Sequence, residues 1–407
     1  MRTICMIVQG VYDSDPRVRR KAEALVAAGY AVDVLALQPP SGQRDYTLNE
    51  VSVRTLALGK ARGSLLRYFY EYFAFFLWVL VRVSVQMSRR HYCVVDVNTL
   101  PDFLVFAPVF ARYMGAKIVL DMHEITPEFY MSKYGSARDS WSIRLLEFLE
   151  RISFRFADHV ITINEPILTL LEKRGLDRSR STVIMNAADE ARFAKVLASR
   201  GTGAASGGPF VMMYHGTLTK IYGLDIAVEA FARAHVDMPG AELWILGSGT
   251  EAGPLGAQVK ALGLESKVKL IGQVPPADIP SWLAMCSLGL LPLRQDVFLD
   301  FAFPNKLPEF IISDTPVMIS RLKAIRHYFS PEALAYFDPN DPVDLGRQMV
   351  LVYGDSERRA RMVVKAREEY ASICWDVMKE RYLAMIAGVA PTEAAAKRES
   401  GAAAART

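Results

Sequence analysis

The segment TICMIVQGVYDSDPRVRRKAEALVAAGYAVDVLAL, residues 3–37, decides the fold. Two short apolar runs, at 3–9 and 31–37, enclose a stretch with helical periodicity at 16–28. Short buried strands that alternate with helices are typical of βαβ units, whose parallel sheets are covered on both faces. The segment therefore predicts the start of a doubly wound α/β domain.

The same alternation continues through two successive series. In the first we expect further strands at 93–97, 117–121 and 159–163, with helices near 65–88, 101–114 and 141–156. In the second we expect strands at 210–214, 242–246, 268–271, 288–291 and 316–319, with helices near 224–236, 254–262, 277–285, 305–313 and 342–386. The small, flexible residues at 194–209 are typical of a linker. The pattern predicts an α/β protein with two Rossmann-like parallel-sheet domains, 1–193 and 210–375, and a disordered tail at 389–407.

Composition excludes several classes of protein. A chain of 407 residues with 51% hydrophobic and 23% charged residues is neither disordered nor collagen-like. Its net charge of +4 is too weak to indicate a nucleic-acid partner. The four cysteines are far apart without CxxC spacing, which argues against a disulfide framework or a zinc site and favours the cytoplasm.

The first strand-to-helix junction is a candidate ligand site. Ser14 or Asp15 can cap the helix, Pro16 suits its first position, and Gly10 allows close approach of a ligand. Open α/β sheets bind ligands at such junctions. One helix face is apolar and the other basic, with Arg17, Arg20 and Lys21. The alternative is a plain helix start with a solvated basic face.

Residues 54–92 form an aromatic and basic segment. Seven Lys or Arg residues accompany a single acidic residue, Glu71, and eight aromatics fall between Tyr68 and Trp78. This density suits an interfacial helix on the inner leaflet of a membrane, with Trp78 at headgroup level and Arg67 and Arg82 reaching anionic phosphates. The longest apolar run has ten residues, too short to span a bilayer. The alternative is a core helix that covers the first sheet.

His123 follows the strand at 117–121, in the sequence DMHE. A histidine at the carboxyl end of a parallel strand can exchange a hydrogen bond with a sugar hydroxyl. HExxH is absent, since position 127 is proline, so the metal interpretation is weak. A structural histidine is the alternative.

Two glycine turns in the second series suit a diphosphate. The first, HGTLTK at 215–220, contains Gly216 and Thr217 and ends in Lys220, and the second contains Gly247. Backbone N–H groups and a helix start can bind an anion there, and Lys220 adds a full charge. Either turn can also be a simple connection.

The segment DFAFPNKLPE, residues 300–309, is the most informative. If Asn305 caps a helix, Lys306 and Glu309 share one of its faces. A cation would then lie near a phosphate, and a carboxylate one turn away can accept two hydrogen bonds from a ribose diol. The alternative is a capped helix with a local ion pair. We favour a site because the adjacent Phe and Pro residues look exposed.

Four segments together resemble glycosyltransferase family 4, the retaining nucleotide-sugar enzymes of the GT-B fold. They are DPRVRRKAEALVAAGYAVDV (15–34), VLDMHEITPE (119–128), HGTLTKIYGLDIAVEAF (215–231) and FPNKLPEF (303–310). The resemblance implies two Rossmann-like domains that face each other across an active-site cleft, and a final helix, 376–388, that returns to the first domain.

The resemblance also implies roles for single residues. Glu309 resembles the Glu that binds the nucleotide ribose, His123 the His near the donor sugar, and Gly10 the glycine that faces the diphosphate. The family's first glutamate would fall at 301, where this chain has Phe301 beside Asp300. The usual phosphate-binding cations align with Thr217 and Tyr222, which leaves Lys220 and Lys306.

The implied reaction is transfer of a hexose from a UDP- or GDP-sugar to a lipid-linked or polysaccharide acceptor, with retention and without a metal or other cofactor. His123, Lys306 and Lys220 would be catalytic. Gly10, Gly216, Thr217, Gly247, Asp300, Asn305 and Glu309 would bind the donor. Arg17 and Arg20 would face the acceptor at the inner membrane, where the enzyme would build a cell-surface polysaccharide. A nucleotide-sugar 2-epimerase and a non-catalytic nucleotide-sugar binding protein remain as alternatives.

Overall fold

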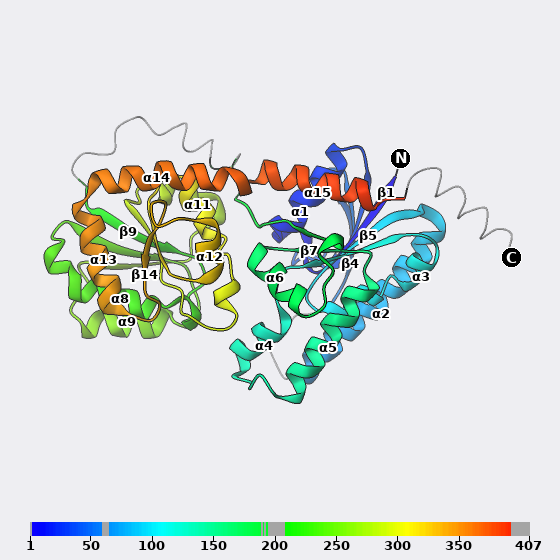
Figure 1. Cartoon of the computed structure of the whole chain (residues 1–407), viewed down its shortest axis with the longest axis horizontal. Coiled ribbons are helices and arrows are strands. Elements are labelled where there is room, and N and C mark those ends of the chain that lie inside the picture. The colour runs from blue at the N-terminus through cyan, green and yellow to red at the C-terminus, as the bar shows by residue number, and fades with distance from the viewer. Residues whose placement is uncertain (1, 59–64, 189, 191–192, 194–207, 392–407) are drawn as a thin grey trace. The chain divides into compact units, whose positions relative to one another are not determined.

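The computed structural model describes residues 2–58, 65–188, 190, 193 and 208–391. It divides the chain into two compact units (Figure 1): unit 1 is Met1–Met185 with Met378–Thr407, and unit 2 is Asn186–Val377. Most of the expected linker, 194–207, and of the expected tail, 392–407, lies outside the described residues. The two α/β units confirm the predicted fold class.

Unit 1 is built on a sheet that is 8-stranded within the described residues. In the order of the sheet, its strands are β3 (Asp45–Leu48), β4 (Val51–Leu56), β2 (Ala31–Leu37), β1 (Thr3–Val11), β5 (Tyr92–Asn98), β6 (Lys117–Met122), β7 (His159–Thr162) and β8 (Ser181–Val183). The β3–β4 pair is antiparallel and the other pairs are parallel. Asn49 and Glu50, both with positive φ, form the hairpin turn. This edge hairpin and β8 were not predicted.

The helices of unit 1 follow the strands in turn. They are α1 (Pro16–Ala27), α2 (Leu65–Arg90), α3 (Val109–Tyr113), α4 (Thr126–Tyr134), α5 (Trp141–Phe156), α6 (Glu165–Lys173) and most of α15 (Trp375–Val389). The helix expected at 101–114 is divided into the 3-10 helix η2 (Asp102–Phe106) and α3, because Pro108 precedes α3 and lacks an N–H. Helices α4 and α6 were not predicted.

Unit 2 contains a 6-stranded sheet whose described pairs are all parallel. The order is β11 (Val268–Gly272), β10 (Ala241–Leu246), β9 (Phe210–His215), β12 (Leu288–Leu291), β13 (Val317–Ser320) and β14 (Ala335–Phe337). Figure 1 shows α8 (Leu224–Ala234), α9 (Ala252–Ala261) and α13 (Pro342–Gly354) on one side of these strands, and α11 (Lys306–Ile312) and α12 (Lys323–Tyr328) on the other.

The single helix expected at 342–386 is three helices: α13, α14 (Ser356–Tyr370) and α15. The break between the first two falls at Asp355, whose carboxylate accepts a hydrogen bond from Arg358 N and so starts a new helix. Strand β14 and helix α12 were not predicted, and the helix expected at 277–285 shortens to α10 (Ile279–Leu283).

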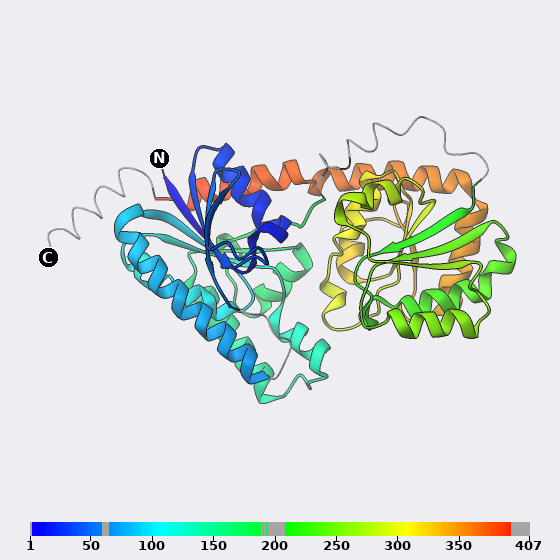
Figure 2. The ribbon, with the colours of Figure 1, turned by 180° about the vertical axis from the view of Figure 1, so that it is seen from behind.

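Helix α2 has two apolar faces, and it is the long blue helix at the edge of unit 1 in Figure 2. Phe75, Val79, Val83 and Met87 are buried, as the core-helix interpretation predicts. A second stripe is exposed and consists of Tyr70, Phe73, Leu77, Val81 and Val85. No described helix is long and apolar enough to cross a membrane.

A buried charge cluster joins α4, α5 and the end of α6. The Arg174 guanidinium pairs bidentately with Glu128 and also lies 3.3 Å from Glu150. Glu150 is fully buried and shares this one cation, so burial raises its pKa to about 8. Burial therefore favours the protonated form of Glu150, and the Arg174 guanidinium opposes that shift.

Candidate active site

Each sheet has one point where the chain turns from building one side to building the other. In unit 1 this point lies between β1 and β5, and in unit 2 between β9 and β12. Open α/β sheets bind ligands at the carboxyl ends of the strands that flank such a point. The residues after β1 and β5 in unit 1, and after β9 and β12 in unit 2, are therefore candidates for ligand binding.

The start of α1 is fixed by Asp15, as predicted. Its side chain accepts from Arg17 N at 3.1 Å and binds the Arg17 guanidinium through both oxygens. Pro16 is the first helical residue, and Arg20 Nε donates to its carbonyl at 3.2 Å. A Cβ on Gly10 would lie 3.5 Å from Val8, an ordinary contact, so no neighbouring residue requires glycine there and its role toward a diphosphate stays a prediction.

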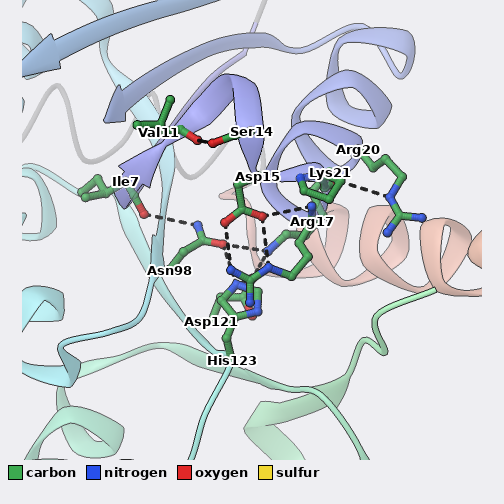
Figure 3. Close-up of polar contacts among 11 residues, drawn as sticks. Ile7, Val11, Ser14, Asp15, Arg17, Arg20, Lys21, Asn98, Asp121 and His123 are labelled. Carbon is green, nitrogen blue, oxygen red and sulfur yellow. Dashed lines mark hydrogen bonds and ion pairs between the residues drawn. The ribbon is translucent and has the colours of Figure 1, made fainter. Parts of the chain in front are cut away.

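Lys21 is buried, so the alternative of a solvated basic face fails for this residue. Its side chain is 3% exposed, forms an ion pair with Asp121 and donates to Asn98 Oδ1 at 2.9 Å (Figure 3). Helix α1 thus inserts an ammonium between the ends of β5 and β6. Desolvation by burial lowers the pKa of Lys21, and the attraction of Asp96 opposes that shift.

His123 joins the same cluster from the end of β6. Its Nε2 lies 3.1 Å from Asn98 Oδ1 and 3.6 Å from Asp121 Oδ2. Asn98 Nδ2 donates to the Ile7 carbonyl at 3.3 Å, so the amide oxygen faces His123 and Nε2 is the donor. Burial, Lys21 and Arg17 hold the pKa of His123 well below its usual range, so the ring is neutral. Its Nδ1 remains an acceptor without a hydrogen-bond partner among the described residues.

Helix α15 adds a further residue to this edge. The Tyr382 hydroxyl donates to Asp96 Oδ2 at 2.8 Å, and both residues are fully buried. Lys21 Nζ lies 5.7 Å from the centre of the Tyr382 ring. The end of the chain therefore completes the polar cluster at the β1–β5 switch point.

In unit 2 the two predicted glycine turns pack against each other. A Cβ on Gly247 would overlap the carbonyl oxygen of Gly216, and a Cβ on Gly216 would overlap Cε of Lys306. Both glycines also have positive φ, 129° at Gly216 and 141° at Gly247. Backbone packing requires glycine at Gly247, positive φ favours it at both positions, and Lys306 lies on the backbone after β9.

Lys306 and Glu309 stand together as predicted, from the first turn of α11. Lys306 Nζ lies 4.7 Å from the centre of the Tyr222 ring and 5.6 Å from that of Tyr214. Burial lowers the pKa of Lys306, and the Glu309 carboxylate opposes that shift. A cation over two ring faces with a carboxylate nearby can hold an anion and a hydroxyl-bearing group side by side.

Three expectations about this segment were wrong. Asn305 precedes α11 but makes no side-chain cap. Phe303 and Pro304 are buried rather than exposed, since Phe303 packs on Tyr328 and Phe329. The reason for favouring a site on those residues therefore fails, and the position of Lys306 replaces it.

The remaining donor-side predictions lie outside the Lys306 cluster. Lys220 is exposed in η4 (Lys220–Tyr222), where its carbonyl accepts from Arg294 Nε at 3.0 Å. Thr217 is exposed, and its carbonyl accepts from the Tyr214 hydroxyl at 2.9 Å. Asp300 and Phe301 lie in η7 (Leu299–Phe301), and Lys323 Nζ lies 4.9 Å from the centre of the Phe301 ring. Lys306, not Lys220, is the cation placed against Gly216.

The predicted membrane residues lie along α2. Arg67 is half exposed and pairs with the buried Glu71 at 3.2 Å. Arg82 is exposed and lies 5.9 Å from the centre of the Trp78 ring, which is itself half-buried.

Sequence reasoning assigned no role to several residues that the structure brings to these edges. Asn98 and His215 end strands, and Asp121 is the last residue but one of β6, and that position is the signal that identifies them. Tyr382 has no such local signal, because its partner Asp96 is 286 residues away.

Comparison with known proteins agrees with this geometry. Residues 14–187 match the glycosyl transferase 4-like domain, and residues 209–355 match the glycosyl transferases group 1 domain. The probable glycosyltransferase WbjE of Pseudomonas aeruginosa is 24% identical over 66% of this chain and 68% of its own. The exopolysaccharide phosphotransferase SCO2592 of Streptomyces coelicolor is 29% identical over 39% of this chain, which spans only 16% of that relative.

A solved structure shows the same fold. Anabaena Alr3699/HepE in complex with UDP-glucose is 16% identical, covers 95% of this chain with 100% of its own, and superimposes with a TM-score of 0.70. The two matched domains follow each other in the order that the sequence resemblance requires. The chain therefore belongs to the family 4-like glycosyltransferases of the GT-B fold.

Proposed function

We propose that this glycosyltransferase moves a hexose from a UDP- or GDP-sugar to a lipid-linked or polysaccharide acceptor, with retention of anomeric configuration. The observation that carries the proposal is Lys306, whose ammonium lies against Gly216 and over two tyrosine rings, with Glu309 one turn away. A cation beside a carboxylate complements a nucleoside diphosphate, whose diphosphate is anionic and whose ribose diol donates hydrogen bonds. The UDP-glucose complex of HepE, which shares the fold, supports the choice of donor.

The proposed chemistry needs no nucleophile from the protein. Cleavage of the anomeric C–O bond leaves an oxocarbenium-like sugar and a diphosphate, so stabilising the departing charge lowers the barrier. Lys306 supplies that stabilisation, and the diphosphate in turn favours its charged form. Neutral His123 accepts a hydrogen bond from a sugar hydroxyl at Nδ1. This scheme assigns charge neutralisation to protein cations and requires no metal or other cofactor.

We further propose that α2 docks unit 1 on the cytoplasmic face of the inner membrane, where a lipid-linked acceptor is found. Its exposed stripe of Tyr70, Phe73, Leu77, Val81 and Val85 lies on the helix that also carries Arg67 and Arg82. Apolar side chains flanked by arginines suit an anionic bilayer surface. Arg17 and Arg20 would then face the acceptor, and the name of the exopolysaccharide relative supports a role in cell-surface polysaccharide biosynthesis.

A thermal-shift screen of UDP-, GDP- and ADP-sugars tests the donor, because a ligand that binds the folded state raises Tm by mass action. The sugar that stabilises the protein is then incubated with membrane lipid extract, and NMR of the product reads the anomeric configuration. Transfer with retention supports the proposal. Release or rearrangement of the sugar without acceptor favours a 2-epimerase, and binding without any turnover favours a binding protein.

Co-sedimentation with vesicles tests the docking surface. Val81→Asp should weaken binding to vesicles that contain anionic lipid, since Val81 is 60% exposed within the stripe. Val364→Asp in α14 is the matched control, because Val364 is also a well-exposed helical valine, at 70%, but belongs to unit 2. Equal binding to neutral and anionic vesicles, or none, would contradict docking by charge and apolar contact.

A further inference from the structure

His215 ends β9 at the switch point of unit 2, directly before Gly216. Its side chain is almost fully buried, and its ring packs on the edge of Phe310 with centroids 5.1 Å apart. The family resemblance assigns it nothing, although it opens the HGTLTK turn. Because this buried imidazole lies next to Lys306 and Glu309, we expect it to have a role at the candidate site.

The ring directs Nε2 toward the neighbouring carboxylate. Nε2 lies 3.4 Å from Glu309 Oε2, and within the described structure this buried nitrogen has no hydrogen-bond partner. Buried polar atoms are rarely left unpaired, because an unmade hydrogen bond in a desolvated place lowers stability. A small rotation of the Glu309 side chain, which is 28% exposed, closes the distance to a hydrogen bond.

The protonation state of His215 follows from its surroundings. Burial and the positive charge of Lys306 lower the pKa of His215 to about 3, so the imidazole is neutral and holds one proton. If that proton were on Nδ1, a nitrogen lone pair would face the carboxylate in a desolvated place. The proton therefore belongs on Nε2, and His215 is a neutral donor toward Glu309.

We propose that His215 is a positioning residue that holds the Glu309 carboxylate, through Nε2–H, in the orientation that receives the nucleotide ribose. The inference rests on the proposed function, which assigns the ribose to Glu309. A neutral donor fixes the carboxylate without adding a second cation beside Lys306, so Glu309 keeps its charge. A carboxylate has about four acceptor sites, so one hydrogen bond from His215 leaves capacity for a diol.

Calorimetric titration with UDP and 2′-deoxy-UDP measures the contribution of the ribose 2′-hydroxyl to binding. If a nucleotide with another base stabilises the protein better, that nucleoside diphosphate and its 2′-deoxy form are used instead. The wild type should bind UDP about tenfold more tightly than 2′-deoxy-UDP, which is about 1.4 kcal/mol. His215→Phe keeps the ring against Phe310 but removes the donor. It should lower the affinity for UDP about three- to tenfold, leave that for 2′-deoxy-UDP unchanged, and so bring the ratio toward one.

Two further variants separate positioning from packing. The amide nitrogen of a glutamine occupies nearly the place of histidine Nε2, whereas that of an asparagine matches Nδ1. His215→Gln should therefore restore the discrimination, and His215→Asn should not. In ¹⁵N NMR spectra His215 should show the Nε2–H tautomer, unchanged from pH 5 to pH 8.

The outcomes keep the two proposals apart. His235→Phe is the matched control, since His235 lies at the end of α8, where its Nδ1 bonds to the Ala232 carbonyl of the same turn. If the wild type binds no nucleoside diphosphate, the proposed function fails and the inference with it. If Glu309→Ala abolishes the discrimination but His215→Phe preserves it, or if His215→Asn restores it as well as His215→Gln does, the inference alone is overturned. Should His215→Phe fail to fold, the Gln and Asn pair still decides.

Discussion

The charged residues at the carboxyl ends of the two sheets lie in different environments. In unit 1 the side chains of Lys21, Asp121 and His123 are at most 5% exposed, and each is bonded to another member of the cluster or to Asn98. In unit 2 Lys306 faces two aromatic rings, and the Glu309 side chain is 28% exposed. The first cluster pairs its charges within the chain and leaves His123 Nδ1 as an acceptor, whereas the second holds a cation against two rings beside a partly exposed carboxylate.

This difference distinguishes charges that fix the structure from charges that bind a ligand. A buried ion pair adds little net stability, since desolvation offsets the attraction, but it fixes geometry, and losing one partner is costly. A cation that contacts aromatic rings and the backbone is attracted to them only weakly, so it can still bind an anion. We therefore expect substitutions in unit 1 to act on stability and those in unit 2 to act on turnover.

The largest effect should come from Lys21→Met. It leaves Asp121 as an uncompensated buried charge, which should lower the free energy of unfolding of unit 1 by about 3–5 kcal/mol. Urea unfolding followed by circular dichroism measures this. Lys306→Met, at the other edge, should cost less than about 1 kcal/mol. Equal losses of stability for the two variants would erase the contrast between the edges.

Lys306→Ala should have the next largest effect, on catalysis. Loss of a positive charge at the departing diphosphate should lower kcat about 10²–10³-fold, equivalent to about 3–4 kcal/mol. Steady-state kinetics with the donor found in the thermal screen gives the value. Lys220→Ala should have a much smaller effect, because Lys220 is exposed and does not lie against Gly216. The reverse order would return the role to Lys220.

Glu150 should make the stability of unit 1 depend on pH. Its pKa rises from 4.5 to about 8 in the folded state, so the stabilisation that its protonated form gives is complete below about pH 4.5 and is lost as the pH rises toward 8. We expect the free energy of unfolding to fall by about 3–4 kcal/mol between pH 5 and pH 8 through this group. Glu150→Gln should remove that part of the slope in pH-dependent urea unfolding, and an unchanged slope would contradict it.

The smallest effects compare two helix starts. Asp15→Ala removes a side-chain cap from α1 and should cost about 1 kcal/mol. Asn305→Ala should cost less than about 0.5 kcal/mol, since Asn305 makes no cap on α11. Thermal unfolding of the two variants checks this order. A larger loss for Asn305→Ala would show that its side chain has a partner there.

Local sequence patterns predicted most strands and helices. The environment of single side chains could not be predicted where it depends on partners far away in the sequence. The apolar runs of β1, β2 and β9 and the cap at Asp15 are readable because a strand or helix start depends on neighbours in sequence. The edge hairpin β3–β4 was missed because edge strands are short and half polar. The burial of Lys21 could not be predicted because its partner, Asp121, is 100 positions later in the chain.

The hydrogen bond between Asp96 and Tyr382 has a consequence for biosynthesis. Chains are made from the N-terminus, and domains generally fold as units during synthesis. Asp96 is fully buried in β5, yet its hydroxyl donor is translated 286 residues later. A nascent unit 1 that emerges before residue 382 lacks the hydroxyl that donates to the buried Asp96 carboxyl, which then keeps its contact with Asn98 Nδ2 at 3.5 Å. Its final packing must therefore await synthesis of all of unit 2.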